Sequence, residues 1–278
     1  MPLAETDAVQ LHYETFGDPS ASPLVLIAGL GAHSISWSDE LCGDLASRGH
    51  HVVRFDNRDI GLSTHLGEGA AYTLSDMAGD TVGLLDALGL ERVHLVGRSM
   101  GGMIAQTVAI QHPERVRTLV SIMSNTGEVD YGQPEPEMLT ALLAMGQPAA
   151  SADAAVEAAV ELARTLGSPG MFDEPFARQV AEEMARRNPD PAAVGRQMLA
   201  VVTSESREEG LRALAIPTLV IHGDADRLVA PSGGRRTAEL VPGAAYVEIE
   251  GMAHDMPRLL WTRYVDLITD FVATATGA

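Results

Sequence analysis

Short runs of β-branched residues alternate with segments of helical spacing along most of this chain, and this alternation restricts the fold more than any other feature. The apolar runs occupy residues 24–28, 51–55, 93–96, 116–122, 218–222 and 245–249. The helical patterns occupy residues 37–48, 73–88, 100–112, 232–240 and 261–273. Such alternation builds a mostly parallel sheet that helices cover on both faces. The sequence therefore predicts an α/β fold.

Between residues 127 and 210 the pattern changes. Valine and isoleucine become sparse, alanine, glutamate, arginine, leucine and methionine take over, and apolar residues recur at helical spacing. The sequence has no internal repeat, low-complexity tract or long linker that would mark a separate domain. We therefore expect one core, formed by residues 1–126 and 211–278, with a helical cap inserted at residues 127–210.

The charge and cysteine content disfavour several classes of protein. The chain has 19 Lys and Arg, all arginine, against 38 Asp and Glu, a formal net charge of −19. An anionic surface of this kind repels nucleic acids and acidic membranes. The single cysteine, Cys42, rules out an internal disulfide. The sequence has no signal-peptide pattern and no apolar run near the roughly 20 residues that span a bilayer. We therefore expect a cytoplasmic protein without membrane insertion. A monomer or a homodimer is expected.

A G-x-S-x-G motif, GRSMG at residues 97–101, lies where an expected strand meets an expected helix. A serine hydroxyl is a poor nucleophile at neutral pH unless a turn exposes it to a base and to donors for the oxyanion. Gly97 and Gly101 lack side chains and allow the strand and the helix to approach each other around Ser99. The motif therefore predicts that Ser99 is a nucleophile.

Two alternatives apply to this turn. Ser99 could be a passive helix N-cap whose glycines only allow close packing, and this alternative stays open. The turn could instead cradle a phosphate. However, Gly97, Gly101 and Gly102 do not give G-x-G-x-x-G, and a chain without lysine has no G-x-x-x-x-G-K-[ST] motif. Nucleotide binding is therefore disfavoured.

A nucleophilic serine needs an imidazole base, and His254 is our candidate. In a strand–turn–helix nucleophile of this kind the chain order is serine, acid, histidine. Of the histidines after Ser99, only His254 lies in a loop after the last expected strand. His112 lies at a helix end and His222 at the end of an apolar strand, so both are expected to be structural.

The loop after residues 218–222 offers two carboxylates for the acid, Asp224 and Asp226. Asp226 lies further past the strand end, at the carboxyl edge of the sheet where ligands collect, and is the preferred candidate. Asp224 is expected to hold the turn through backbone amides. A metal site at His222, Asp224 and Asp226 is disfavoured because the spacing is nearly continuous and further ligands are lacking.

Two backbone amides are expected to stabilise the oxyanion. One is that of Met100, directly after Ser99, and the other is that of Leu30 in the Gly29-Leu30-Gly31 turn after the first apolar run. Gly29 and Gly31 could also serve only to form a tight turn. This alternative is compatible with the role of Leu30, because the same turn points the Leu30 amide toward the oxyanion.

The motifs GRSMGG, GDADRLVAP and GMAH, in this order and spacing, resemble the α/β-hydrolase superfamily over nearly the whole chain. The segment from Trp37 to Ser63, together with PTLVIHGDAD and GMAH, is similar to aclacinomycin methylesterase-like actinobacterial carboxylesterases. The resemblance implies a mostly parallel eight-stranded sheet flanked by helices, an inserted helical cap and no cofactor. It also implies a Ser99, Asp226 and His254 triad, with Leu30 and Met100 as oxyanion donors.

The sequence departs from many of these relatives at Ala28, which precedes Gly29 where they carry histidine. The departure raises the question of what hydrogen-bonds the oxyanion loop. Dehalogenases and epoxide hydrolases of this fold carry aspartate at the nucleophile position, so Ser99 argues against both. Asp56 and Arg58 are expected to be a structural pair that braces a turn.

The inserted segment suggests the kind of substrate. Residues 127–210 contain 6 Arg against 15 Asp and Glu, so anionic substrates should be disfavoured. Its apolar side chains could cover a hydrophobic pocket, where methionines would adapt to ligands of irregular shape. Alternatively, they could pack against one another and against the sheet. The candidate substrate-binding residues are Met138, Leu142, Met145, Met171 and Met198.

These observations predict a serine hydrolase that cleaves carboxylic esters of small, mainly hydrophobic substrates through an acyl-enzyme. The same triad would serve a lactonase, a thioesterase, a carbon–carbon bond hydrolase or a cofactor-free perhydrolase. An alternative of another class is a ligand-binding receptor with vestigial hydrolase activity.

Overall fold

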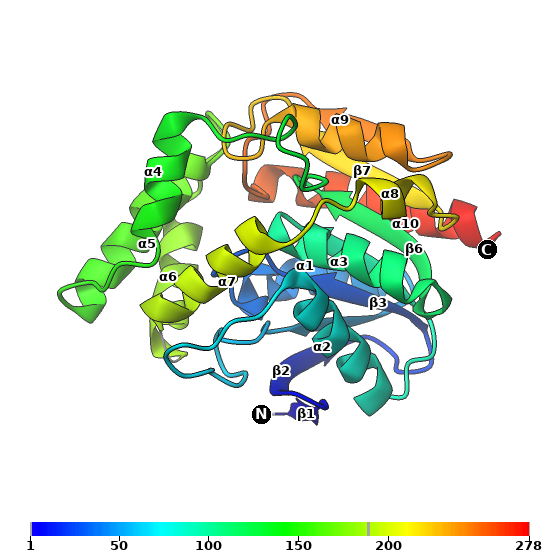
Figure 1. The fold of residues 1–278 in the computed structure, drawn as a ribbon, viewed down its shortest axis with the longest axis horizontal. Helices are drawn as coiled ribbons and strands as arrows, with labels where there is room; N and C mark the ends of the chain where they lie inside the picture. Colours follow the sequence, from blue (N-terminus) through cyan, green and yellow to red (C-terminus); the bar gives the residue numbers. More distant parts are fainter. Residues whose placement is uncertain (1, 188–189, 278) are drawn as a thin grey trace.

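The structure, a computed structural model, describes residues 2–187 and 190–277. Its centre is an eight-stranded sheet in the order β1-β2-β4-β3-β5-β6-β7-β8 (Figure 1). β2 runs antiparallel to β1 and β4, and the other neighbours are parallel. The strands are β1 Leu3–Glu5, β2 Gln10–Phe16, β3 Ser22–Ile27, β4 His50–Phe55, β5 Val93–Arg98, β6 Val116–Ile122, β7 Thr218–Gly223 and β8 Ala245–Ile249. The predicted fold class is confirmed.

Helices cover both faces of the sheet (Figure 1). On one face lie α1 Asp39–Ser47 and α10 Trp261–Thr276. On the other lie α2 Leu74–Ala87, α3 Met100–Gln111, α8 Glu208–Arg212 and α9 Pro231–Leu240.

Alternation of side chains along the strands divides the core in two. In β3, Leu24 and Leu26 join the cluster under α1 and α10, whereas Val25 and Ile27 join the cluster under α2 and α3. All four are fully buried. This explains why the expected strands read as continuous apolar runs rather than as alternating ones.

The ends of the helices follow their capping residues. The expected helix at residues 37–48 begins later, at Asp39, because the Ser38 hydroxyl caps the Leu41 amide at 3.1 Å. Trp37 instead follows a short 3-10 turn and is buried. Thr73 caps α2 through a capping box with Asp76, which the pattern at residues 73–88 anticipated closely.

Between β6 and β7 the chain forms further helices that lie beside the sheet rather than over one of its faces (Figure 1). They are α4 Pro136–Ala144, α5 Ala152–Leu166, α6 Glu174–Arg186 and α7 Pro191–Thr203. α8 follows them and contacts α3 and α9. The expected boundary between residues 210 and 211 therefore falls inside a helix that packs with the core.

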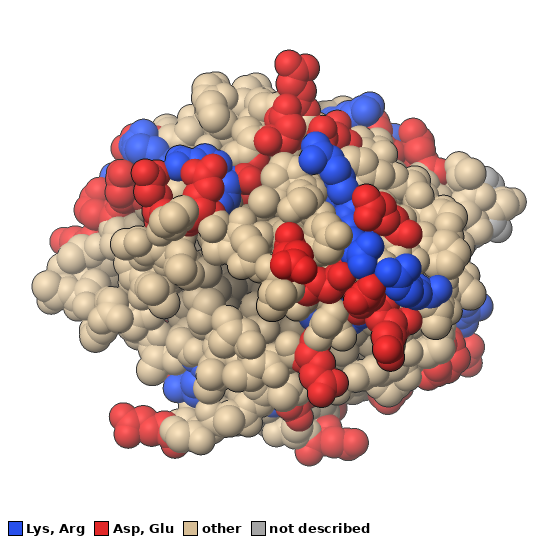
Figure 2. All heavy atoms as spheres, turned by 45° about the horizontal axis from the view of Figure 1, so that its top comes forward, with Lys and Arg blue, Asp and Glu red and all other residues tan. Residues whose placement is uncertain are grey.

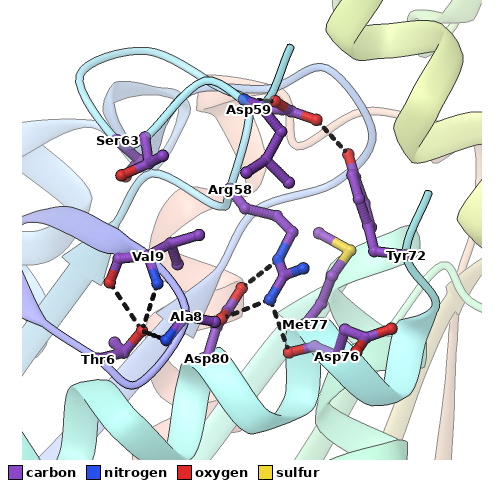
Figure 3. A network of polar contacts seen from close by, with 12 residues as sticks. Thr6, Ala8, Val9, Arg58, Asp59, Ser63, Tyr72, Asp76, Met77 and Asp80 are labelled. Atoms are coloured by element: carbon purple, nitrogen blue, oxygen red, sulfur yellow. Dashed lines mark hydrogen bonds and ion pairs between the residues drawn. The ribbon is translucent and has the colours of Figure 1, made fainter. Parts of the chain in front are cut away.

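A buried ion pair between Arg58 and Asp80 holds the chain after β4 (Figure 3). Arg58 donates to both carboxylate oxygens of Asp80 in α2, with Nη2 2.7 Å from Oδ1. Asp56 instead accepts from the amides of Ser34 and Leu62, at 2.6 and 3.0 Å. The expectation that Asp56 and Arg58 pair with each other is corrected, because the two side chains point to different elements.

Acidic side chains outnumber arginines on the face drawn in Figure 2, in line with the net charge of −19. Among the described residues, no helix is both long and apolar enough to cross a membrane.

Arg58→Met should lower the free energy of unfolding by about 3–5 kcal/mol, because it leaves the carboxylate of Asp80, which is 3 % exposed, without its partner. The double variant Arg58→Met, Asp80→Leu should recover most of this loss. Denaturant titration measures both. Arg186→Met is the matched control at an exposed pair with Glu183 and should change the value by less than about 1 kcal/mol. Equal effects of the two single variants would contradict the prediction.

Candidate active site

Ser99 lies in a sharp turn between β5 and α3. Its φ of 53° and ψ of −125° are a conformation that a non-glycine residue rarely adopts. A Cβ at Gly97 would lie 2.1 Å from the Gly101 carbonyl oxygen, and one at Gly101 would lie 2.2 Å from that of Ile27. The turn therefore requires glycine at both positions. The Ser99 side chain makes no capping hydrogen bond to α3, which disfavours the passive N-cap alternative.

Three residues far apart in the sequence meet at this turn. His254 Nε2 lies 3.0 Å from Ser99 Oγ, and His254 Nδ1 lies 2.7 Å from Asp226 Oδ2. The structure thus brings together the predicted nucleophile, base and acid in hydrogen-bonding order. This geometry lets the imidazole accept a proton from the serine hydroxyl while the carboxylate stabilises the resulting cation.

Asp226 is held in its charged form. Its Oδ1 accepts from the amides of Leu228 and Val229, both at 2.9 Å. Burial by itself would raise the pKa of Asp226, but the electrostatic interaction with His254 and hydrogen bonds from His222 and His254 hold that pKa well below its usual range. Asp226 is therefore an anion at neutral pH and can orient His254.

The neighbours of Asp226 have structural contacts. His222, fully buried, has its Nε2 2.8 Å from the Val229 carbonyl oxygen and 3.3 Å from Asp226 Oδ2. Asp224 accepts from the Gly251 amide at 2.7 Å and so ties together the loops after β7 and β8. Within residues 2–187 and 190–277, no group of three or more His, Cys, Asp or Glu is placed to hold a metal ion.

The loop of His254 is anchored by the end of α5 and the segment that follows it. The His254 amide donates to the Leu166 carbonyl at 3.0 Å. Ser168 Oγ donates to Asp255 and accepts from the Ala253 amide, the latter at 2.8 Å. Ser168 was missed by sequence reasoning, since a serine within the expected helical cap carries no signal of a distant partner.

The turn at residues 29–31 approaches the nucleophile directly. A Cβ at Gly29 would lie 3.2 Å from that of Ser99. The Leu30 amide donates to no acceptor among the described residues, and Met100 is the first residue of α3, where an amide has no partner within the helix. Both predicted donors are thus free to bind a ligand oxygen, and α3 adds the partial positive charge of its N-terminus.

The question raised by Ala28 has a structural answer. The Ala28 carbonyl accepts from Asn57 Nδ2 at 3.1 Å, and the Gly31 amide donates to Gln197 Oε1 of α7 at 2.9 Å. Gln197 was also missed. The available signal was its position between Ala193 and Ala200, which places a polar side chain on the buried stripe of a helix.

A cavity of about 600 Å³ opens above Ser99 and His254. Leu142, Met145, Met171 and Met198 line it together with other apolar side chains of α5, α6 and α7. Met138 is not among the lining residues. It is 3 % exposed and packs against Leu228 and Val229, so its expected contact with substrate is corrected. Met138 supports the loop of Asp226 instead.

The chain belongs to the α/β hydrolase fold family, whose model matches residues 22–257. It is 32 % identical to the rhodomycin D methylesterase DauP of Streptomyces sp. (strain C5), over 90 % of this chain and 91 % of that protein. It is 31 % identical to the rhodomycin D methylesterase DnrP of Streptomyces peucetius, over 92 % of each. The crystal structure of a hydrolase from Pseudomonas aeruginosa PA01 superposes with a TM-score of 0.78 and 26 % identity, covering 99 % of this chain and 97 % of that one.

Gly97→Ala should destabilise the protein by about 3 kcal/mol or more, because the new methyl group meets backbone that cannot move aside. The matched control is Gly79→Ala in α2, where a Cβ meets nothing within 4 Å. That substitution should stabilise by about 0.4–1 kcal/mol. Denaturant titration compares the two, and a Gly97→Ala protein as stable as wild type would refute the packing argument.

Proposed function

We propose that this protein is a carboxylic ester hydrolase that works through an acyl-enzyme on Ser99. The observation that carries the proposal is the hydrogen-bonded chain from Ser99 through His254 to Asp226, at 3.0 and 2.7 Å, below an apolar cavity. The similarity to two methylesterases over about 90 % of the chain supports the same bond type.

In the first half-reaction, Ser99 Oγ forms a bond to the ester carbonyl carbon while His254 Nε2 takes the hydroxyl proton. The carbonyl oxygen becomes an oxyanion that accepts hydrogen bonds from the Leu30 and Met100 amides, each worth on the order of 3 kcal/mol in the transition state. The tetrahedral intermediate then expels the alkoxide, which leaves as the alcohol after receiving the proton from His254.

In the second half-reaction, water attacks the acyl-enzyme and gives a proton to His254. The tetrahedral intermediate collapses to the carboxylic acid, and the proton returns to Ser99 Oγ. Asp226 remains ionised throughout and stabilises the imidazolium that forms in each half-reaction.

The cavity favours a neutral, mainly hydrophobic acyl group. Its volume is about 600 Å³, and it is lined largely by aliphatic, methionine and aromatic side chains. Residues 127–210 act in this proposal as a cap over the site, and their excess of acidic residues disfavours anionic substrates. The methylesterase relatives favour methanol as a leaving group. They also favour an ester over a lactone, a thioester, a carbon–carbon bond, a peracid or a receptor ligand.

Ser99→Ala should lower kcat at least about 10⁴-fold, because it removes the atom that forms the acyl-enzyme. The assay is multiple turnover on a panel of neutral aryl methyl esters, p-nitrophenyl esters, lactones and thioesters. Ser75→Ala, at an exposed serine of α2 bonded to Gln111, is the control and should keep wild-type rates. Turnover by Ser99→Ala near the wild-type rate, or the absence of multiple turnover on any ester, would overturn the proposal.

A further inference from the structure

Gln197 of α7 joins two backbone segments of the core, the 29–31 turn beside the nucleophile and the chain after β4. Its Oε1 accepts from the Gly31 amide at 2.9 Å, and its Nε2 donates to the Arg58 carbonyl at 2.9 Å. The side chain is fully buried. Both polar ends of the amide are therefore used inside the protein, and they connect the helical segment to the core.

Among the described residues, the 29–31 turn makes few other hydrogen bonds that would fix its conformation. Its own closing bond runs from the Ala32 amide to the Gly29 carbonyl at 3.2 Å, and Gly31 has a φ of 66°. Glycine at a left-handed position gives the backbone freedom that other contacts must restrict. The Ala28 carbonyl is held by Asn57, so Gln197 supplies the restraint at the opposite end of the turn.

The amide that Gln197 holds is the neighbour of the one that the reaction uses. The Gly31 nitrogen belongs to the peptide plane that follows Leu30, and the proposed donor is the Leu30 nitrogen just before it. Because each peptide unit is planar, fixing the Gly31 amide restricts the rotation of Leu30 about its two backbone dihedrals. A donor that is misplaced by a fraction of an ångström stabilises an oxyanion less well.

We infer that Gln197 is a positioning residue that holds the Leu30 amide toward the oxyanion, so that transition-state stabilisation depends on the two hydrogen bonds of this side chain and not on the docking of α7 in general. The inference rests on the proposed function. It assigns to the helical segment a part in the chemical step, in addition to enclosing the substrate. Loss of the Gln197 bonds should therefore reduce kcat more than it weakens substrate binding.

Arg196, the next residue in α7, offers a matched control. It binds Asp59 through two hydrogen bonds of 2.8 and 3.0 Å and Asp190 through one of 2.9 Å. It therefore docks α7 on the core, and within the described part of the chain it makes no hydrogen bond to the 29–31 turn. Arg196→Met should lower the melting temperature while the Gln197 bonds remain.

The experiment measures kcat and KM for p-nitrophenyl butyrate in wild type, Gln197→Met and Arg196→Met. It also measures affinity for an aryl trifluoromethyl ketone, which places a negative oxygen at the oxyanion position, and for an unreactive ether isostere. In Gln197→Met, kcat and ketone affinity should each fall by about ten- to a hundredfold. Ether affinity should stay within about twofold, as should kcat in Arg196→Met. If Gln197→Met does not fold, Gln197→Asn, whose shorter amide cannot span both partners, is measured instead.

A wild-type kcat in the folded Gln197 variant overturns the inference. So does an equal loss in Arg196→Met, or an equal weakening of the ether and the ketone. Ser99→Ala, measured in parallel, distinguishes failure of the proposed function from failure of this inference alone. If wild-type turnover does not require Ser99, the proposed function fails and this inference with it. If turnover requires Ser99 but not Gln197, the inference alone fails.

Discussion

The close approach of α3 to the ends of β3 and β5 is the constraint on which the rest of the site depends. Only glycine fits at residues 97 and 101, where a Cβ would meet backbone oxygens at 2.1 and 2.2 Å. This packing holds Ser99 at a φ of 53°, at the start of α3 and within 3.0 Å of His254. The imidazole of His254, the cavity and the two free amides can act together only because the Ser99 hydroxyl lies between them.

The helical segment between β6 and β7 lines the cavity and also forms hydrogen bonds with two loops of the site. Ser168 binds the loop of His254, and Gln197 binds the turn that contains Leu30. The proposed base and one proposed oxyanion donor are therefore both supported by residues outside the α/β core. In the proposed hydrolase, the catalytic geometry would therefore depend on the same segment that lines the cavity.

The sequence predicted strands β3 to β8, helices α1, α2, α3, α9 and α10 and the residues that meet at Ser99, because these rest on local rules. It did not locate β1 and β2, which carry no continuous apolar run, or the separate helices of residues 127–210. Apolar runs mark covered strands, and the spacing in GRSMG marks a strand-to-helix turn. The predictions from sequence were wrong where the partner of a side chain lies far away in the chain. Arg58 binds Asp80 rather than Asp56, and Met138 faces the loop of Asp226 rather than the cavity. Such choices depend on packing in three dimensions, which no local spacing encodes.

The most direct test of the account is the covalent state of Ser99 after reaction with a fluorophosphonate. The reagent requires an activated nucleophile and donors for its phosphonyl oxygen. Intact-protein and peptide mass measurements should find one adduct per chain, located on the peptide that contains Ser99, and none in Ser99→Ala. An adduct on another residue, or an unmodified Ser99 in a protein that hydrolyses esters, would contradict the central claim.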